Sequence, residues 1–424
     1  MHALFIPFAP SWAHVSRCLA LAEAWRVNGH TASFAIGPEQ LATAHNAGFE
    51  TRPVPEVPGA VFRTDQGFRW LTREYFAQNL QTEQSILADV KPDLVVFDFR
   101  FTASSSAHLA HLPSVSILHG SALRLALWPR ETARLLIGDP RPARGISALR
   151  LCLIRRLFPI VFQLVLRTVA RRFASILKTR GLPPVNSLFD LLLGDEILLA
   201  DIPDLLPPEI PSNCHVIGPL MWSGWDQPAP WLDEFDARPL VYVTMGSTVE
   251  AQSTLVKIIE ALRDAPYNIV VSTGNLSLPT DLDLPPRMRV FPRVPGAAVM
   301  RRSAAVVHHG GHETLMQALA AGVPSLILPA NPDQILVAQQ AQALGIGRSL
   351  WQPDGLPVGA APLHKVTSVQ IRRQVDDLIA DQECARMCKT LQHKIGAFPG
   401  AASAAEVLER IATSFMIGKS SMEQ

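Results

Sequence analysis

Short apolar runs alternate with segments of helical spacing along the chain, and this alternation restricts the fold more than any other feature. In the first half, the apolar runs cover residues 2–9, 31–36, 92–99 and 113–118, with helical patterns over 15–30 and 102–112. A strand reaches a parallel neighbour only through a crossover connection, which is usually a helix. The alternation therefore predicts a parallel sheet covered by helices.

The same alternation begins again after a proline-dense stretch between Ile202 and Pro239. Strands are expected over 240–246, 268–273, 287–292, 304–309 and 324–329. Because 424 residues are too many for one core, two doubly wound domains are expected. We predict a first domain over 1–221, a linker over 222–238, a second domain over 239–400, and a C-terminal helix over 401–424 that packs back on the first domain.

Composition and charge exclude several classes of protein. A net charge of +1 disfavours a nucleic-acid-binding protein. Five scattered cysteines suit a reducing cytoplasm better than a disulfide framework. The N-terminus does not have the pattern of a signal peptide. The most apolar internal run, 157–166, is shorter than the roughly 20 residues that a membrane-spanning helix needs.

The segment from Val306 to Gln334, VVHHGGHETLMQALAAGVPSLILPANPDQ, raises three interpretations: a metal site, a phosphate-binding loop or an ordinary turn. A metal site would need three histidines to converge, but neighbours in a strand, such as His308 and His309, face opposite sides. A phosphate-binding loop is favoured, because glycine amides and a helix N-terminus at the end of a strand attract anions. In that interpretation His309 and Thr314 add side-chain donors.

An acid–amide pair, Asp333 and Gln334, follows the next strand at the start of the next helix. Two adjacent polar side chains suit the hydroxyls of a sugar. The structural alternative is that Asp333 caps its helix. Both interpretations are compatible with one another.

Several of these segments together resemble a known family. The run from 308 to 334, with HHGG, ALAAGVP, LP and DQ at these spacings, resembles the donor-sugar signature of family 1 glycosyltransferases. RPLVYVTMGS (238–247) resembles the opening of their second domain, VIGPLMW (216–222) their linker, and residues 5–34 their first strand, loop, helix and strand. The resemblance implies an α/β fold of the GT-B type, in which two Rossmann-like doubly wound domains face a deep cleft. The donor would bind the second domain and the acceptor the first.

The resemblance also implies roles for particular residues. His14 matches the family's general base, and Asp98 matches the carboxylate that orients this base. The other matches are diphosphate-binding Ser247, His309, Gly311 and Thr314, nucleoside-binding Arg293 and Gln317, and sugar-binding Asp333 and Gln334. The implied reaction is a single displacement that inverts the anomeric carbon, with the helix dipole and histidine charge stabilising the departing diphosphate. It implies no metal and no cofactor, with a nucleotide-sugar as co-substrate.

The sequence departs from the family pattern near the proposed donor. Glu313 places an acid close to the diphosphate, where it would repel the ligand unless it turns away or accepts helix amides. Gln317 stands where enzymes that use UDP-sugars have a ribose-binding glutamate, which leaves dTDP-sugars open. Trp12 and Ala13 replace the glycines that usually precede the catalytic histidine.

A basic segment over 141–180 contains ten Lys and Arg residues and no acid, interleaved with apolar side chains. One interpretation is a surface for peripheral contact with a membrane. The favoured one is a solvated helix pair that lines an apolar acceptor pocket.

We expect a cytoplasmic hexosyltransferase, with membrane association as an alternative, acting as a monomer or a homodimer. The donor would be a UDP- or dTDP-linked hexose or deoxyhexose, and the acceptor an apolar small molecule such as a polyketide, terpenoid, phenolic or lipid-like compound. The rivals are a sugar-nucleotide epimerase of the same architecture and a non-catalytic nucleotide-binding homologue. A nicotinamide dehydrogenase is disfavoured because no GxGxxG follows the first strand.

Overall fold

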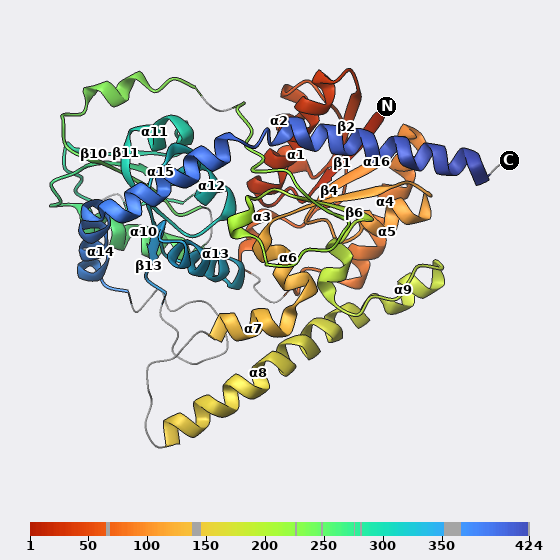
Figure 1. Cartoon of the computed structure of the whole chain (residues 1–424), viewed down its shortest axis with the longest axis horizontal. Helices are drawn as coiled ribbons and strands as arrows, with labels where there is room; N and C mark the ends of the chain where they lie inside the picture. The colour runs from red at the N-terminus through yellow and green to blue at the C-terminus, as the bar shows by residue number, and fades with distance from the viewer. Residues whose placement is uncertain are drawn as a thin grey trace. The chain divides into compact units, whose positions relative to one another are not determined.

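The computed structural model describes residues 1–64, 68–137, 146–224, 227–246, 249–274, 276–279, 282–351 and 366–422. The chain forms two compact units (Figure 1). Unit 1 contains Met1–Ala133, Leu157–Ser223 and Phe398–Gln424, and unit 2 contains Arg134–Arg156 and Gly224–Ala397. Each unit has its own sheet, as the repeated alternation predicts.

The sheet of unit 1 has seven strands in the order β3-β2-β1-β4-β5-β6-β7, and every pairing is parallel. Its strands are β1 (His2–Pro7), β2 (Thr31–Ile36), β3 (Glu50–Pro53), β4 (Leu94–Asp98), β5 (Ser114–Leu118), β6 (Glu196–Leu199) and β7 (Cys214–Val216). The prediction of a parallel α/β sheet is confirmed. The strand order reverses between β1 and β4, so the carboxyl ends of these two strands lie side by side at a topological switch point.

Helices cover both faces of this sheet because alternate side chains of its strands are apolar on both faces. Ala3 and Phe5 of β1 point to a core shared with α1 and α16, whereas Leu4 and Ile6 point to a core shared with α4 and α5. Each large apolar side chain buried in these cores contributes about 1.5–3 kcal/mol. The helices of this unit are α1 (Trp12–Val27), α2 (Pro38–Asn46), α3 (Gly59–Thr64), α4 (Arg73–Val90), α5 (Ala103–Leu109), α6 (Gly120–Leu127), α9 (Ala174–Thr179) and α16 (Ala401–Met422).

The sheet of unit 2 has six strands in the order β10-β9-β8-β11-β12-β13, again all parallel. They are β8 (Leu240–Thr244), β9 (Asn268–Ser272), β10 (Met288–Phe291), β11 (Ser303–His308), β12 (Ser325–Ile327) and β13 (Gly347–Ser349). The helices are α10 (Val249–Leu262), α11 (Gly296–Arg302), α12 (His312–Ala321), α13 (Pro332–Ala343), α14 (Ser368–Ala380) and α15 (Gln382–Gly396). Here the order reverses between β8 and β11.

Two parts of the chain differ from the sequence-based expectation. Within the proline-dense stretch, Cys214–Val216 forms the edge strand β7, where the sequence predicted no strand. A strand of three residues is too short to produce a recognisable alternation. In the described part of the basic segment, the first element is α8 (Ile146–Arg171), which follows α7 (Pro129–Ile137), and Arg134–Arg156 belong to unit 2 rather than to the first unit.

Candidate functional site

His14 lies in the first turn of α1, directly after the carboxyl end of β1. The helix begins at Trp12 with Ser11 as its N-cap, and the backbone amide of His14 donates to the Ser11 carbonyl at 3.3 Å. Asp98 ends β4, the neighbouring strand. The reversal of strand order therefore places both residues at the same edge of the sheet, 84 positions apart in sequence.

The side chains of His14 and Asp98 are in direct contact. Nδ1 of His14 lies 2.6 Å from Oδ1 of Asp98. Arg17, one turn further along α1, donates from Nε to Oδ2 at 2.7 Å and from Nη2 to Oδ1 at 3.0 Å, which makes a two-pronged ion pair with the carboxylate. The ionised carboxylate can only accept, so Nδ1 of His14 carries the proton and Nε2 keeps its lone pair. Nη2 of Arg17 also lies 2.9 Å from Nδ1 of His14, but both atoms are then donors, so this contact is not a hydrogen bond.

The side chains of Asp98, Arg17 and His14 are buried to different extents. The side chains of Asp98 and Arg17 are 2 % and 4 % exposed, whereas that of His14 is 15 % exposed. Burial alone would raise the pKa of Asp98, but the charge of Arg17 and the hydrogen bond from His14 outweigh it and lower that pKa to about 2. Asp98 is therefore ionised at neutral pH, and the imidazole is the part of the trio most open to a reactant.

Phe99 covers one face of the His14 ring. The two rings stack with their centroids 4.9 Å apart and their planes 6° from parallel. Phe8, at the end of β1, meets the same imidazole edge-on at 6.2 Å. The backbone of Phe99 has φ of 54°, a left-handed conformation that costs a bulky residue about 1–2 kcal/mol. Such strain persists only where the surrounding structure holds the residue in place.

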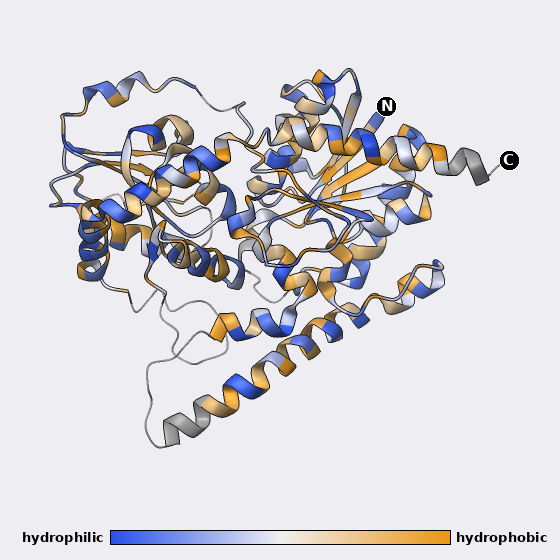
Figure 2. Ribbon diagram, viewed as in Figure 1, coloured by the Kyte–Doolittle hydropathy of each residue, from blue (hydrophilic) through white to orange (hydrophobic). Residues whose placement is uncertain are grey.

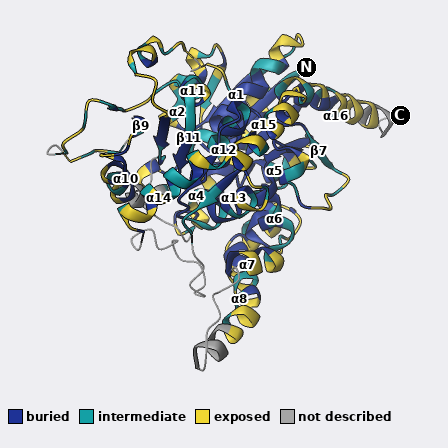
Figure 3. Cartoon of the chain, turned by 60° about the vertical axis from the view of Figure 1, so that its left-hand side comes forward, coloured by how far each residue is buried: buried dark blue, intermediate teal, exposed yellow. Residues whose placement is uncertain are grey.

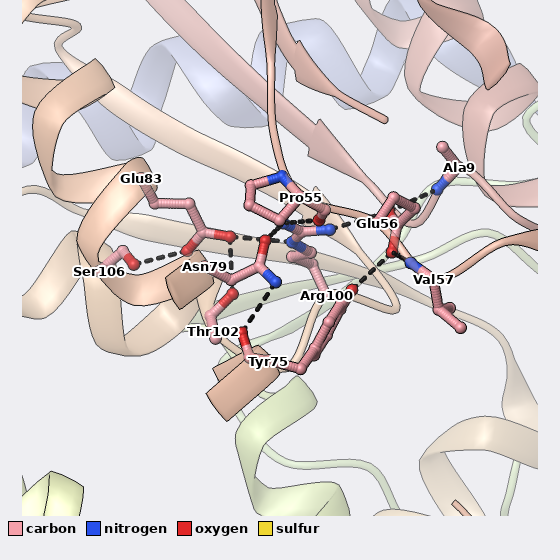
Figure 4. Close-up of polar contacts among 10 residues, drawn as sticks. All are labelled: Ala9, Pro55, Glu56, Val57, Tyr75, Asn79, Glu83, Arg100, Thr102 and Ser106. Atoms are coloured by element: carbon pink, nitrogen blue, oxygen red, sulfur yellow. Dashed lines mark hydrogen bonds and ion pairs between the residues drawn. The ribbon is translucent and has the colours of Figure 1, made fainter. Parts of the chain in front are cut away.

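The next residue, Arg100, supplies that support through a buried polar network (Figure 4). Its Nε donates to Glu83 of α4 at 2.8 Å, and its Nη1 donates to Glu56, after β3, at 2.8 Å. Nη2 donates to the side chain of Asn79. The side chains of Arg100, Glu56 and Glu83 are at most 3 % exposed. This network ties the loop after β4 to α4 and to the loop after β3.

Further bonds connect the network to both ends of the site. Glu83 accepts from the hydroxyls of Thr102 and Ser106 at 2.6 Å, which fixes the start of α5 (Figure 4). Glu56 accepts from Tyr75 at 2.5 Å and from the backbone amide of Ala9 at 3.3 Å. Burial raises the pKa of Glu56, although the charge of Arg100 opposes this effect. Because Ala9 belongs to the loop that leads to His14, the network supports both loops at the switch point.

Sequence reasoning identified His14 and Asp98 but missed Arg17 and Arg100. The signal for Arg100 was present, since a single arginine interrupts the apolar run VVFDFRF. For Arg17 the signal was its position three residues after His14, which places both on one helix face.

In unit 2, His309 follows β11 at the corresponding switch point and is enclosed by glycines. A Cβ on Gly311 would lie 2.7 Å from Nε2 of its ring, and a Cβ on Gly246, after β8, would lie 3.1 Å from Cε1. Gly246 has φ of 69°, which favours glycine. The glycines of the MGS and HGG motifs therefore admit the His309 imidazole between two loops.

The histidines of this loop do not converge on a metal. The rings of His308 and His309 lie 6.5 Å apart at 89°. Among the described residues, no group of three His, Cys, Asp or Glu side chains is arranged to hold a metal ion. Burial lowers the pKa of His308 to about 3 and that of His309 to about 4. Both are neutral at pH 7 in the free protein, so neither ring carries the positive charge that was expected to stabilise the departing diphosphate.

Helix α12 presents its N-terminus directly after this loop. Gly311 is its N-cap and has no side chain that could cap the first turn. Thr314 is partly exposed in that turn. Nε2 of Gln317 donates to Oε1 of Glu313 at 3.3 Å. One oxygen of the Glu313 carboxylate is therefore directed along the helix surface towards the next turn.

The loop after β12 packs against the loop after β11. A Cβ on Gly310, whose φ is 91°, would lie 2.9 Å from the Ile327 side chain and 3.1 Å from the backbone oxygen of Gln334. Asn331, not Asp333, caps α13, since its side chain accepts from the Gln334 amide at 3.0 Å. The capping alternative for Asp333 is therefore wrong. Instead, the negative charge of Asp333 partly offsets the effect of burial, which lowers the pKa of His309.

The remaining predicted residues are Gln334, Arg293, Gln317 and Ser247, and the structure describes the first three. Gln334 is buried, and its Oε1 accepts from the Ala330 amide at 2.8 Å, which leaves Nε2 as the group for a ligand. Arg293 is exposed between β10 and α11. Gln317 lies near the start of α11, where a Cβ on Gly296 would be 3.5 Å from its Oε1. Ser247 lies outside the described residues.

Each unit therefore carries a cluster of polar side chains at the switch point of a Rossmann-like sheet, one with a histidine–carboxylate pair and one with a glycine-bounded histidine beside a helix N-terminus. Comparison with known proteins defines the class. The model of the erythromycin biosynthesis protein CIII-like C-terminal domain matches residues 256–410. A PGL/p-HBAD biosynthesis glycosyltransferase of Mycobacterium tuberculosis (strain ATCC 25177 / H37Ra) is 30 % identical over 353 residues, which cover 81 % of this chain and 79 % of that protein.

Two other matches agree. A PGL/p-HBAD biosynthesis rhamnosyltransferase of Mycobacterium bovis (strain BCG / Pasteur 1173P2) is 32 % identical over 355 residues, covering 81 % of this chain and 75 % of that protein. The solved structure of the glycosyltransferase VinC in complex with DTDP matches with a TM-score of 0.68 at 22 % identity, covering 98 % of this chain and 100 % of that one. The chain belongs to the family 1 glycosyltransferases and has their GT-B architecture. It is a glycosyltransferase of the natural-product type.

Proposed function

We propose that this glycosyltransferase inverts the anomeric carbon and transfers a hexose or deoxyhexose from a UDP- or dTDP-sugar to a hydroxyl of an apolar small molecule. The observation that carries the proposal is the bond of 2.6 Å between His14 Nδ1 and Asp98 Oδ1. This bond leaves Nε2 of His14 as a base, held in orientation by a carboxylate that Arg17 keeps ionised.

The first half of the reaction takes place at His14. Nε2 accepts the proton of the acceptor hydroxyl as that oxygen forms a bond to the anomeric carbon of the donor sugar. The resulting imidazolium is stabilised by the Asp98 carboxylate at Nδ1. Stacking of Phe99 on the ring limits its rotation, so the lone pair of Nε2 keeps its direction.

The second half takes place at α12. As the bond from the anomeric carbon to the phosphate oxygen breaks, the diphosphate leaves with the electron pair and an added negative charge. We assign the first-turn amides of α12, the ring of His309 and the hydroxyl of Thr314 to this charge. Gly311 lets the His309 ring approach the helix start. Asp333 and the Nε2 group of Gln334 are assigned to the sugar, and Arg293 and Gln317 to the nucleoside.

A dTDP-linked deoxyhexose is the donor best supported. One relative is a rhamnosyltransferase by name, and the structure of VinC contains DTDP. Gln317 supports the same choice, because its amide is bonded to Glu313 and it lacks the two carboxylate oxygens that would hold both ribose hydroxyls of UDP.

An apolar acceptor is supported by the aromatic side chains around His14. Phe8 stacks on Trp70 at 5.2 Å, and Phe99 meets Phe101 edge-on at 5.2 Å. Trp70 also contacts Phe101 at 6.0 Å, so the rings form one continuous group beside the base. The names of two relatives place them in PGL/p-HBAD biosynthesis, where PGL is a glycolipid, which supports a lipid-like or phenolic acceptor.

The proposal is tested by release of dTDP from dTDP-rhamnose and dTDP-glucose in the presence and absence of phenolic and lipid-like acceptors. His14→Ala is expected to lower kcat by about 10²–10⁴, while dTDP affinity in calorimetry stays unchanged. His45→Ala, a change at an exposed histidine of α2, is the matched control. Conversion of the donor sugar without any acceptor would indicate the epimerase instead. Unchanged turnover in His14→Ala would reject His14 as the base.

Two further measurements test the donor half. His309→Ala is expected to weaken dTDP binding at least about tenfold, the effect of one lost hydrogen bond to a charged group. Metal independence is a prediction of the same assignment, and turnover that stops when EDTA is added would contradict it. A cytoplasmic location remains a prediction from the scattered cysteines.

A further inference from the structure

Helix α8 carries a row of apolar side chains that the protein does not cover. Leu153, Leu157, Ile160, Val161, Leu164 and Val165 are each 44–53 % exposed. They follow one another at intervals of 4, 3, 1, 3 and 1 residues, which places them on one side of a helix. We call these six residues the α8 stripe. In Figure 2 the ribbon of α8 carries hydrophobic residues along its length, and Figure 3 shows that much of the helix is exposed.

The opposite side of the same helix is packed inside unit 1. Leu166, Val169 and Ala170 are buried. Phe173, just after α8, stacks on Phe76 of α4 with the ring centroids 4.6 Å apart. The last turns of the helix therefore bury one apolar side, and the α8 stripe, on the opposite side, is about half exposed.

The stripe is unusual for a surface. Six of the sixteen large apolar side chains that are exposed among the described residues lie on it, and they span about 18 Å of helix. Isolated exposed apolar residues are normal, but a contiguous group marks an interaction surface. Among the described residues, no helix is long and apolar enough to cross a bilayer.

Basic side chains border the stripe, and no acid lies near it in sequence. Arg156 stands four residues before Ile160, Arg167 three after Leu164, and Arg171, the last residue of α8, seven after Leu164, so each is close to the stripe on the helix surface. All three are exposed. Residues 141–180 contain ten Lys and Arg and no Asp or Glu.

We propose that the α8 stripe and its arginines bind the surface of an anionic lipid bilayer. A helix with an apolar side bordered by arginine lies in the plane of such a surface, where lipid headgroups neutralise the arginines and acyl chains receive the apolar side chains. A second copy of the chain would bring two arginine borders together without a carboxylate in either segment, which is unfavourable. The charge of the segment therefore selects lipid over self-association. In this proposal the basic segment is a membrane-binding surface rather than the solvated helix pair that its sequence favoured, because the apolar side chains of the stripe face outwards.

The first test measures co-sedimentation of the full chain with vesicles of phosphatidylcholine alone and of phosphatidylcholine mixed with phosphatidylglycerol. Binding is expected with the anionic vesicles, to be much weaker with the neutral ones, and to fall as salt is added. Equal binding to both vesicle types, or no binding to either, would overturn the proposal.

The second test removes the apolar contribution. Leu157→Gln, Val161→Gln and Leu164→Gln together are expected to weaken binding by about tenfold for each side chain. The matched control is Val369→Gln, a change at a residue of α14 that is 78 % exposed, which should leave binding unchanged. The thermal midpoint of each variant reports whether it folds. Unchanged vesicle binding by a folded triple variant would reject the stripe.

The third test removes the charge. Arg156→Gln, Arg167→Gln and Arg171→Gln together are expected to weaken binding to anionic vesicles about 100-fold, since each basic side chain near such a surface contributes a factor of about five. Residual binding to neutral vesicles should not change. Light scattering without lipid tests whether a second copy of the chain covers the stripe instead. If the wild type is a dimer that does not bind vesicles, and the Leu157→Gln, Val161→Gln and Leu164→Gln variant is a monomer, the stripe is a dimer interface and the proposal is overturned. None of these measurements depends on transferase activity.

Discussion

Replacing Asp98 by asparagine keeps the shape of the side chain but removes a charge and leaves a single acceptor oxygen. In the native protein one carboxylate oxygen accepts Nε of Arg17 at 2.7 Å, and the other accepts Nδ1 of His14 at 2.6 Å. An amide cannot accept at both positions. If its oxygen keeps Arg17, its NH₂ group faces His14 and donates to Nδ1. The proton of the imidazole then moves to Nε2, and the base is lost.

The expected loss of rate follows from this change of tautomer. A catalytic histidine that is held in the wrong tautomer loses about 10⁴ in kcat. We expect a loss of about 10²–10⁴ for Asp98→Asn, because Arg17 can hold the amide in either orientation. Donor affinity should not change, since Asp98 lies in unit 1 and the residues assigned to the diphosphate lie in unit 2.

The expected loss of stability is calculated from the pKa of Asp98. A carboxyl whose pKa is held at about 2 rather than 3.8 contributes about 2 kcal/mol to folding at neutral pH. Because the folded-state pKa is the lower one, this contribution is complete above pH 3.8 and is lost as the pH falls towards 2. The asparagine oxygen still accepts Arg17, so the loss should be nearer 2 kcal/mol than the roughly 3–5 kcal/mol of a fully broken buried pair.

The assay compares dTDP release and urea unfolding for the wild type, Asp98→Asn and a control, Asp93→Asn. Asp93 accepts from the backbone amide of His2 at the opposite end of β4 and has no contact with His14. The control should keep wild-type kcat. Wild-type kcat in folded Asp98→Asn would refute the role of Asp98 in orienting the base, and a stability difference that persists unchanged at pH 2 would refute the assignment of that difference to its charge.

Three further outcomes are expected. Arg17→Met should destabilise unit 1 by about 3–5 kcal/mol, because it leaves the buried Asp98 carboxylate without its partner; a urea midpoint equal to that of the wild type would contradict this. Gly310→Ala should lower the thermal midpoint and weaken dTDP binding, since its Cβ would meet Ile327 at 2.9 Å and the residue has φ of 91°; the exposed Gly345→Ala, whose added Cβ meets nothing within 4 Å, separates the clash from the backbone effect. Burial holds the pKa of His308 at about 3 rather than 6.5, so stability should be complete above pH 6.5 and fall as the pH drops towards 3, by up to about 5 kcal/mol from this residue; urea midpoints of His308→Leu across this range should show a smaller slope.

The sequence by itself determined the class of fold and named candidate site residues. Hydrophobic periodicity is a local property, so nine of the strands and their parallel pairing could be predicted from short windows, whereas the short strands β3, β6, β7 and β13 were not predicted. Motifs confined to one loop, such as HHGG, were also recognisable, because a glycine-rich turn before a helix has the same physical consequence wherever it occurs.

Only the tertiary structure decided which distant groups meet. Arg17 contacts Asp98, 81 positions later in the sequence, because β1 lies beside β4 in the sheet. The order of strands in a sheet cannot be predicted from the sequence of either strand alone. The network around Arg100 likewise joins the loops after β1, β3 and β4, and no local sequence pattern predicts that these loops lie close together.

The same physical reason accounts for the points on which the sequence was wrong or silent. Asp333 and Asn331 are equally good caps by residue type, and the choice of Asn331 depends on where the chain leaves β12. The spacing of α8 indicates apolar residues on more than one side, but which side is buried depends on the contact of Phe173 with Phe76, a residue almost 100 positions earlier. Local pattern therefore determined the elements and their motifs, whereas the pairing of buried charges and the exposure of the α8 stripe required the packed chain.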